Sequence, residues 1–191
     1  HMVGRFPDAL AMCATVISVP VNEEAIGAFR KYLHTTLDNS FTMPLHITLD
    51  SYPETSKNGW IHNCREILLG LVGLAQWRND HDSTNLAKKF VRAIEEVTRK
   101  DGHFLSGAIG INGWGTFADD QLNMCSGRLI RALLQYYHYT GDNLGVILAE
   151  RFAKTNIGLT FTPAGGLTKA SGNHLHSTQG TMTGLIDLGM L

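Results

Sequence analysis

The sequence repeats itself, and the repeat restricts the fold more than any single motif does. The pattern Gly-Arg-x-x-x-Ala-Leu occurs at residues 4–10 and again at 127–133. In both copies a Phe beside basic residues follows 24 positions after the Arg, at Phe29 and at Phe152. Internal repetition at a fixed period is typical of an array or a closed ring of structural units.

A middle copy fits with one insertion, because Phe90 follows Arg65 by 25 positions. Apolar residues in each copy recur at helical spacing, with a short break between two segments. The sequence therefore predicts an all-α, single-domain protein, an array of helical hairpins followed by one more helix. The three hairpins are expected at about 5–39, 60–101 and 120–157, and the C-terminal helix at about 177–189.

Capping signals set several expected helix ends. We expect Asn22 to cap the second helix and either Asp82 or Ser83 to cap the fourth. The first helix is expected to run to about Val19, and the sixth to end at Gly158.

The lengths of the connections predict where a site lies. Connections within a hairpin are short, whereas those between hairpins are long and rich in Gly, Pro and His. The first helix of each hairpin is the more apolar one, so these helices are expected to form an inner layer. The long loops then gather at one rim, over the N-termini of the inner helices, where the helix dipoles add partial positive charge.

Composition excludes several classes of function. Hydrophobic residues make up 43% of the 191 residues, which is ordinary for a globular protein. The formal net charge of −1 and the scattered Lys and Arg give no footprint for nucleic acid. No apolar run reaches the about 20 residues of a membrane span. The N-terminus shows no secretion-signal pattern, and the sequence does not indicate a compartment.

Three cysteines, Cys13, Cys64 and Cys125, have no metal-ligand spacing, and an odd number argues against a disulfide framework. We expect all three to be small packing residues. No cofactor is predicted.

Local segments resemble the six-hairpin glycosidases, which have an (α/α) toroid fold. They are residues 60–66, the Tyr-x-x-Thr-Gly-Asp phrase at 137–142 and the loop-to-helix entry at 174–180. The resemblance implies part of an (α/α)6-type toroid, because three hairpins are present where a full ring has six. It also implies a glycoside hydrolase, or a fragment of one, acting on a saccharide.

Glycoside cleavage needs two carboxyl groups, and the acids expected at the rim supply the candidates. Glu54 and Asp120 are the predicted catalytic pair, although Asp120 or its neighbour Asp119 could instead cap the fifth helix. Two rival functions stay open. A polysaccharide lyase on the same toroid would rely on His and Tyr near an Arg, and a helical-repeat interaction module would have no acid-lined cleft.

Four further residues at this rim are predicted to bind the substrate. His62, His174 and His176 would donate hydrogen bonds, and Trp114, set between glycines, would offer a flat face to a sugar ring. His174 and His176 could bind a metal from an extended segment, but no third ligand lies at a fixed spacing, so no metal is predicted.

The remaining expectations concern packing. Arg5, Arg65 and Arg128 recur at equivalent positions, which favours bracing of neighbouring hairpins over binding of a uronic acid carboxylate, and Glu66 is expected to pair with a nearby base. An open array leaves two bare edges, so a homodimer that buries the C-terminal helix is expected. Predicted core residues are Leu71, Leu74, Leu133 and Phe152.

Overall fold

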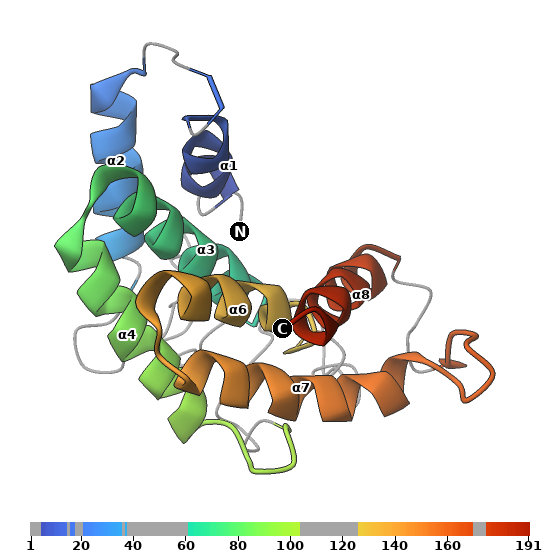
Figure 1. The fold of residues 1–191 in the computed structure, drawn as a ribbon. Coiled ribbons are helices and arrows are strands. Elements are labelled where there is room, and N and C mark those ends of the chain that lie inside the picture. Colours follow the sequence, from blue (N-terminus) through green and yellow to red (C-terminus); the bar gives the residue numbers. More distant parts are fainter. Residues whose placement is uncertain are drawn as a thin grey trace, which may run out of the picture. The chain divides into compact units, whose positions relative to one another are not determined.

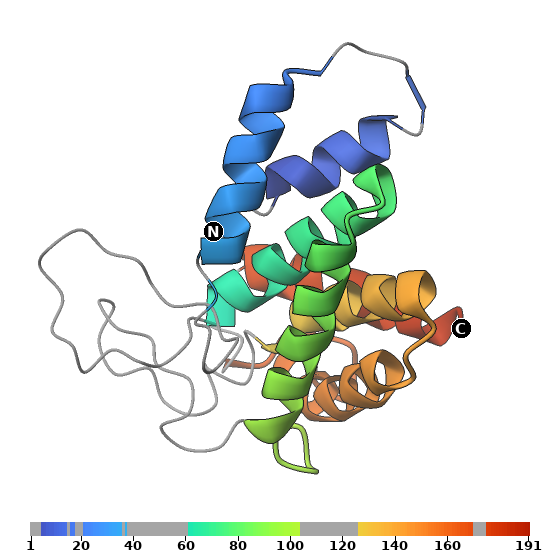
Figure 2. The ribbon, with the colours of Figure 1, turned by 90° about the vertical axis from the view of Figure 1, so that its left-hand side faces the viewer.

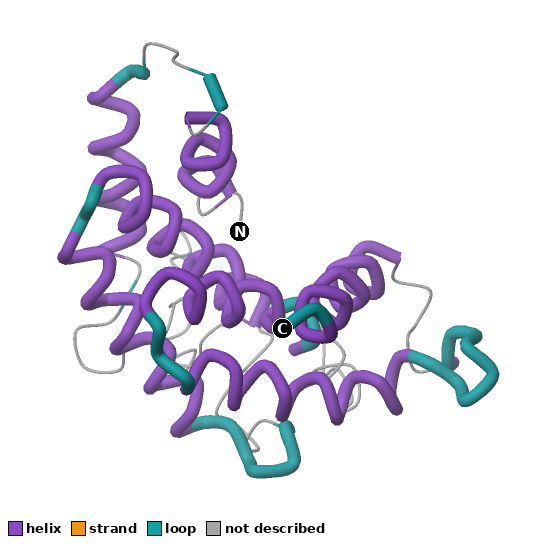
Figure 3. The backbone as a smooth tube through the Cα atoms, in the orientation of Figure 1, coloured by secondary structure: helices purple, strands orange, loops and turns teal. Residues whose placement is uncertain are grey.

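The computed structural model confirms that the chain is all-α (Figures 1 and 3). It describes residues 5–14, 16–17, 21–35, 37, 61–103, 126–169 and 175–191, and for 61–63 and 175–177 it describes the backbone alone. Within these ranges no residue lies in a β-strand, and Phe161 and Leu167 form an isolated β-bridge. The helices are α1 (Arg5–Ala14), α2 (Glu23–Thr35), α3 (Ile61–Arg78), α4 (His81–Glu96), α6 (Leu129–Thr140), α7 (Leu144–Thr160) and α8 (Leu175–Gly189).

The chain divides into two compact units, His1–Ile94 and Glu95–Leu191, and each is described by itself. The single domain expected from the sequence stays a prediction. None of the described helices combines the length and the apolar character needed to cross a membrane.

Helix α3 is the core of the first unit. Every residue from Glu66 to Ala75 is buried, as expected for a helix that is apolar nearly all round. Leu71 and Leu74 are at most 1% exposed, which confirms two of the predicted core positions. Helix α1 packs along α3, and a Cβ on Gly73 would lie 3.0 Å from the Cα of Asp8, so a glycine permits this close approach.

Helix α1 lies beside both α2 and α3 (Figure 2). The rings of Phe6 and Phe29 stack with centroids 5.5 Å apart, which joins α1 to α2. Helix α1 ends at Ala14, short of the predicted Val19. Val16 and Ile17, beyond its end, are β-branched and exposed, so neither helix propensity nor packing extends the helix.

Asn22 caps α2 as predicted, because its Oδ1 accepts a hydrogen bond from the backbone N–H of Ala25 at 3.1 Å. The predicted capping residue of α4, Asp82 or Ser83, was wrong by two or three positions. The cap is Asp80, whose Oδ1 accepts from the N–H groups of Asp82 and Ser83 at 3.2 and 3.3 Å. The side chain of Ser83 is fully buried and donates to Asp80 instead.

Helices α6 and α7 pack against each other as a hairpin in the second unit. Gly141, in the left-handed region at φ 71°, ends α6, and Asp142 Oδ1 accepts from the N–H of Leu144 at 3.0 Å. Leu133 and Phe152 are fully buried, which confirms the other two predicted core positions.

Helix α7 continues to Thr160, two residues beyond the predicted stop at Gly158. A helical glycine lowers helix stability by about 1 kcal/mol. Here the buried side chains of Asn156 and Thr160, on either side of Gly158, fix the last turn by packing.

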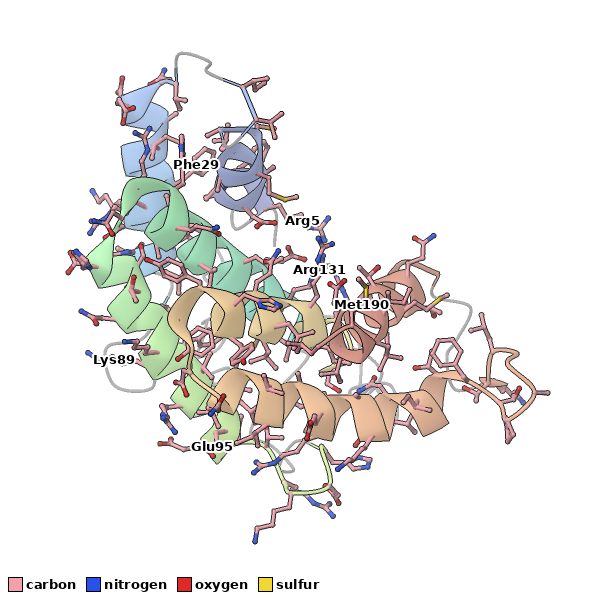
Figure 4. The ribbon with its side chains drawn as sticks, viewed as in Figure 1. Arg5, Phe29, Lys89, Glu95, Arg131 and Met190 are labelled. Carbon is pink, nitrogen blue, oxygen red and sulfur yellow. The ribbon has the colours of Figure 1, made fainter. Side chains whose placement is uncertain are left out.

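Helix α8 packs on α6 through its small residues. A Cβ on Gly184 would lie 2.8 Å from Ile130 Cβ and 3.0 Å from the backbone N of Arg131. Arg131 on α6, labelled in Figure 4, also pairs with Asp187 of α8 at 3.5 Å.

Of the three cysteines, Cys64 is buried as expected, and burial raises the pKa of its thiol to about 12. Cys13 is exposed, so its prediction as a packing residue was wrong. Cys13 lies near the C-terminal end of α1, and the buried residues of this helix are Pro7 and Ala11. Cys125 lies outside the described residues.

Candidate functional site: a buried polar junction

Buried polar side chains concentrate at one place in the second unit. Six of the nine polar or charged residues that are buried in the described part of the chain lie just before α6, in the last part of α7 or in the first turns of α8. None of the six is more than 5% exposed. We call this set the polar junction; its members are Ser126, Arg128, Asn156, Thr160, Thr178 and Thr181.

The junction is held together by contacts to the turn that precedes α6. Asn156 Nδ2 donates to Ser126 Oγ at 2.8 Å and to the carbonyl of Phe152 at 2.8 Å. A Cβ on Gly127 would lie 2.8 Å from Asn156 Oδ1 and would overlap the side chain of Thr181. Glycine at 127 thus lets side chains from α7 and α8 close on the same turn.

Helical periodicity places Thr160 on the helix face that carries Asn156, and Thr178 on the face that carries Thr181. Thr160 follows Asn156 by four positions on α7, and Thr178 precedes Thr181 by three on α8, so each pair shares one face of its helix. A Cβ on Gly180 would lie 3.1 Å from Arg128 Cγ, which places the Arg128 side chain against α8.

Among the amide and hydroxyl side chains of the junction, three polar atoms have no hydrogen-bond partner within the described part of the chain. They are Asn156 Oδ1, Thr160 Oγ1 and Thr178 Oγ1, and all are shielded from solvent. Buried polar atoms are nearly always paired, and an unpaired one costs about 1–3 kcal/mol. These three atoms therefore mark a place where the fold leaves hydrogen-bonding capacity unused.

The N-termini of α6 and α8 both lie at the junction. Their free backbone N–H groups and the aligned peptide dipoles give this end a partial positive charge. The guanidinium of Arg128 adds a full positive charge that is almost completely buried. The junction thus combines fixed positive charge with hydroxyl and amide groups, a set that suits a polar, oxygen-rich ligand.

A second buried polar group, in the first unit, is an ion-pair clamp. Glu66 is 1% exposed, and its Oε1 accepts from Arg5 Nη2 at 2.9 Å and lies 3.5 Å from Arg65 Nη1. The hydrogen bond with Glu66 raises the pKa of Arg5. This clamp joins α1 to α3 and confirms both the pairing of Glu66 with a nearby base and the bracing role of Arg5.

A third group contains Ser83, His34 and Asp80 but is not a nucleophilic triad. Ser83 Oγ donates its hydrogen to Asp80 Oδ2 at 2.9 Å. His34 Nε2 lies 3.0 Å from Ser83 Oγ and must therefore be the donor in that contact. In a triad the histidine instead accepts the proton of the serine. Ser83 is also fully buried, so no substrate reaches it, and the group ties α2 to the start of α4.

The predicted site residues fall where side chains are not described. Glu54, Trp114, Asp120 and His174 lie outside the described residues. His62 and His176 lie in the first turns of α3 and α8, where only the backbone is described. All six roles stay predictions. Across the described residues, no three His, Cys, Asp or Glu side chains come together in a group that could hold a metal ion.

Most of the junction was not predicted from the sequence. Asn156, Thr160, Thr178 and Thr181 were given no role as functional residues. A signal was present: polar residues recur at helical spacing within otherwise apolar segments at 156 and 160 and at 178 and 181. Such a pattern places polar groups on a buried face, which is uncommon unless they are paired or bind something.

Comparison of the chain with protein-family profiles, with curated proteins and with solved structures found no match.

Proposed function

We propose that the protein acts on carbohydrate, as a glycoside hydrolase of the helical-hairpin toroid type or as part of one. The observation that carries this proposal is the polar junction. It lies at the N-termini of α6 and α8, and inner-helix N-termini are the end at which the repeat pattern predicts the site.

Two of the predicted residues adjoin the junction along the chain. His176 lies two positions before Thr178, and Asp120 lies six positions before Ser126. Six residues span at most about 20 Å, so Asp120 is within reach of the junction.

The two described turns within hairpins support a ring of repeated units. Each places one residue in the left-handed region, Asn79 at φ 52° and Gly141 at φ 71°. Each follows it with a capping aspartate, Asp80 or Asp142, 62 positions apart. The turn within the Tyr-x-x-Thr-Gly-Asp phrase is therefore a structural signal that the second hairpin shares with the third.

In the proposed reaction one of the pair Glu54 and Asp120 is held protonated and donates a proton to the departing glycosidic oxygen. The other is ionised and activates water or attacks the sugar.

The test is a reducing-sugar assay on a panel of neutral and uronic-acid oligosaccharides. Glu54→Gln and Asp120→Asn should each reduce the rate by about 100-fold or more, because general acid–base catalysis contributes that much. Glu150→Gln, an exposed carboxylate on α7, is the matched control and should leave the rate unchanged.

Full activity in both carboxamide variants would reject the carboxylate pair. Release of an unsaturated uronate product, seen by its ultraviolet absorbance, would identify the lyase alternative instead. No cleavage of any oligosaccharide by the wild-type chain would favour the interaction module.

A further inference from the structure

We infer that the polar junction is a sugar-binding subsite in which Asn156 Oδ1, Thr160 Oγ1 and Thr178 Oγ1 take their missing hydrogen bonds from the hydroxyl groups of the ligand. The inference rests on the proposed function and names a binding surface that the carboxylate pair does not include.

The hydrogen-bonding character of the three atoms defines the ligand. Asn156 donates two hydrogen bonds through Nδ2, whereas its Oδ1, which can only accept, has no donor in the described part of the chain. A threonine hydroxyl both donates and accepts. A ligand that satisfies all three must offer both donors and acceptors, as the hydroxyl groups of a sugar do.

Burial makes these contacts selective. In a site shielded from water, a polar group left unpaired by a poor ligand costs more than the bond it loses, so the site favours a ligand with hydroxyls at the right positions. The three atoms are covered in the free chain, so a sugar reaches them only after the ends of α6, α7 and α8 separate. Association is then limited by that opening, and its observed rate levels off as the sugar concentration rises.

Stability and binding should change in opposite directions when a hydroxyl is removed. Thr→Val keeps the side-chain volume and β-branching and deletes only the hydroxyl. Where the hydroxyl has no partner in the free protein, its loss removes a buried unpaired group and leaves stability unchanged or higher. Loss of a hydrogen bond to the sugar should weaken binding by about three- to tenfold per hydroxyl.

The experiment uses the full chain and the variants Thr160→Val and Thr178→Val. Thermal unfolding gives stability, and titration calorimetry with the same neutral and uronic-acid oligosaccharides gives affinity. Thr183→Val is the matched control, because Thr183 lies on α8 and its hydroxyl already donates to the carbonyl of Gln179 at 2.9 Å. That control should lose a little stability and keep its affinity.

Unchanged or raised melting temperatures together with weakened binding would support the subsite. Lower melting temperatures with unchanged affinity would show that the hydroxyls bind internal water, and unchanged affinity with higher stability would show an idle polar core; either overturns the inference. In both cases binding by the wild-type chain leaves the proposed function standing. A wild-type chain that binds no oligosaccharide overturns the inference and the proposed function together.

Discussion

The carboxylate of Asp80 joins α2 and α4 of the first unit. It caps α4, accepts a hydrogen bond from the hydroxyl of Ser83, and accepts two more from Arg30 of α2, at 2.6 Å from Nε and 3.2 Å from Nη2. Burial alone would raise the pKa of Asp80, but the hydrogen bonds from Arg30 and Ser83 outweigh it and hold the pKa at about 2. Asp80 therefore contributes to stability only while it is ionised.

Asp80→Asn should make the protein less stable near neutral pH and less sensitive to acid. The folded-state pKa lies below the unfolded value of about 3.9, so the stabilisation, about 2 kcal/mol, is present above about pH 4 and is lost as the pH falls toward 2. Urea unfolding across that range should show a slope in the wild type that the variant lacks. Equal slopes in the two proteins would mean that another carboxylate is responsible.

Leu71→Ala should destabilise the protein by about 2–5 kcal/mol, because the side chain is fully buried in α3 and its loss leaves a cavity. Ile147→Ala, at a site that is 44% exposed on α7, is the control and should change stability by about 0.5 kcal/mol or less. Chemical unfolding of both variants measures the difference. Similar midpoints for the two would show that α3 is not internal.

Single residues were predictable where one rule decided their role. Leu71 and Leu133 follow from apolar periodicity, and the Asn22 cap follows from a polar residue directly before an apolar run. The capping residue of α4 was not predictable, because Asp80, Asp82 and Ser83 are all residue types that cap helices. Contact with Arg30, 50 positions away in the chain, selects Asp80, and no local pattern reports such a contact.

Among the elements, α6 and α8 approach each other most closely at Gly184, and this closeness explains why α8 is rich in small residues. The face that carries Gly180 and Gly184 packs within the same chain.

Gly184→Ala should weaken the docking of α8, because the added methyl would meet the backbone of Arg131 as well as Ile130, and backbone cannot move aside cheaply. We expect a loss of about 1–3 kcal/mol. Gly158→Ala is the matched change: nothing lies within 4 Å of its added methyl, so helix propensity should raise stability by about 0.5–1 kcal/mol. Unfolding of the two variants should move in opposite directions, and a shift of the same sign in both would disprove the close-packing account.

Helix positions were largely predictable from periodicity, while their ends were not. The predicted start of the third helix, Trp60, lies one residue from the observed Ile61. Helix α7 extends to Thr160 because that side chain is buried. Helix α1 ends before Val16 and Ile17 because those side chains are exposed and pack against nothing in the described part of the chain that would extend it. At the end of α7 packing overrides local propensity, whereas at the end of α1 packing and propensity agree.

At the scale of the whole molecule, the repeat of apolar helix and tight turn was predictable, because it follows from periodicity and turn chemistry. The candidate site was not. Its members come from three elements and are separated by up to 55 positions, from Ser126 to Thr181. Only folding brings them together.

The homodimer stays a prediction, and the structure adds a surface for it. Met182 and Ile186 of α8 are apolar and exposed, and so is Met190 directly after the helix. Met190 is labelled in Figure 4. A self-complementary apolar stripe can be buried by a second copy across a two-fold axis, with an interface above about 1,000 Å².

Light scattering at micromolar concentration should therefore give twice the 21.0 kDa mass of one chain. Ile186→Glu should return the mass to that of one chain, whereas Ile157→Glu, on an exposed position of α7, should not. A stable, monodisperse wild-type protein of single-chain mass would rule the dimer out.

The contrast between the exposed Cys13 and the buried Cys64 lets thiol alkylation report on opening of the first unit. A thiol reacts as its thiolate, so the exposed Cys13 is open to an alkylating reagent, while burial and the high pKa protect Cys64 inside α3. Cys64 becomes reactive only in molecules whose core has opened. The rate at which it is alkylated therefore counts openings of α3 under native conditions, without denaturant and without any introduced probe.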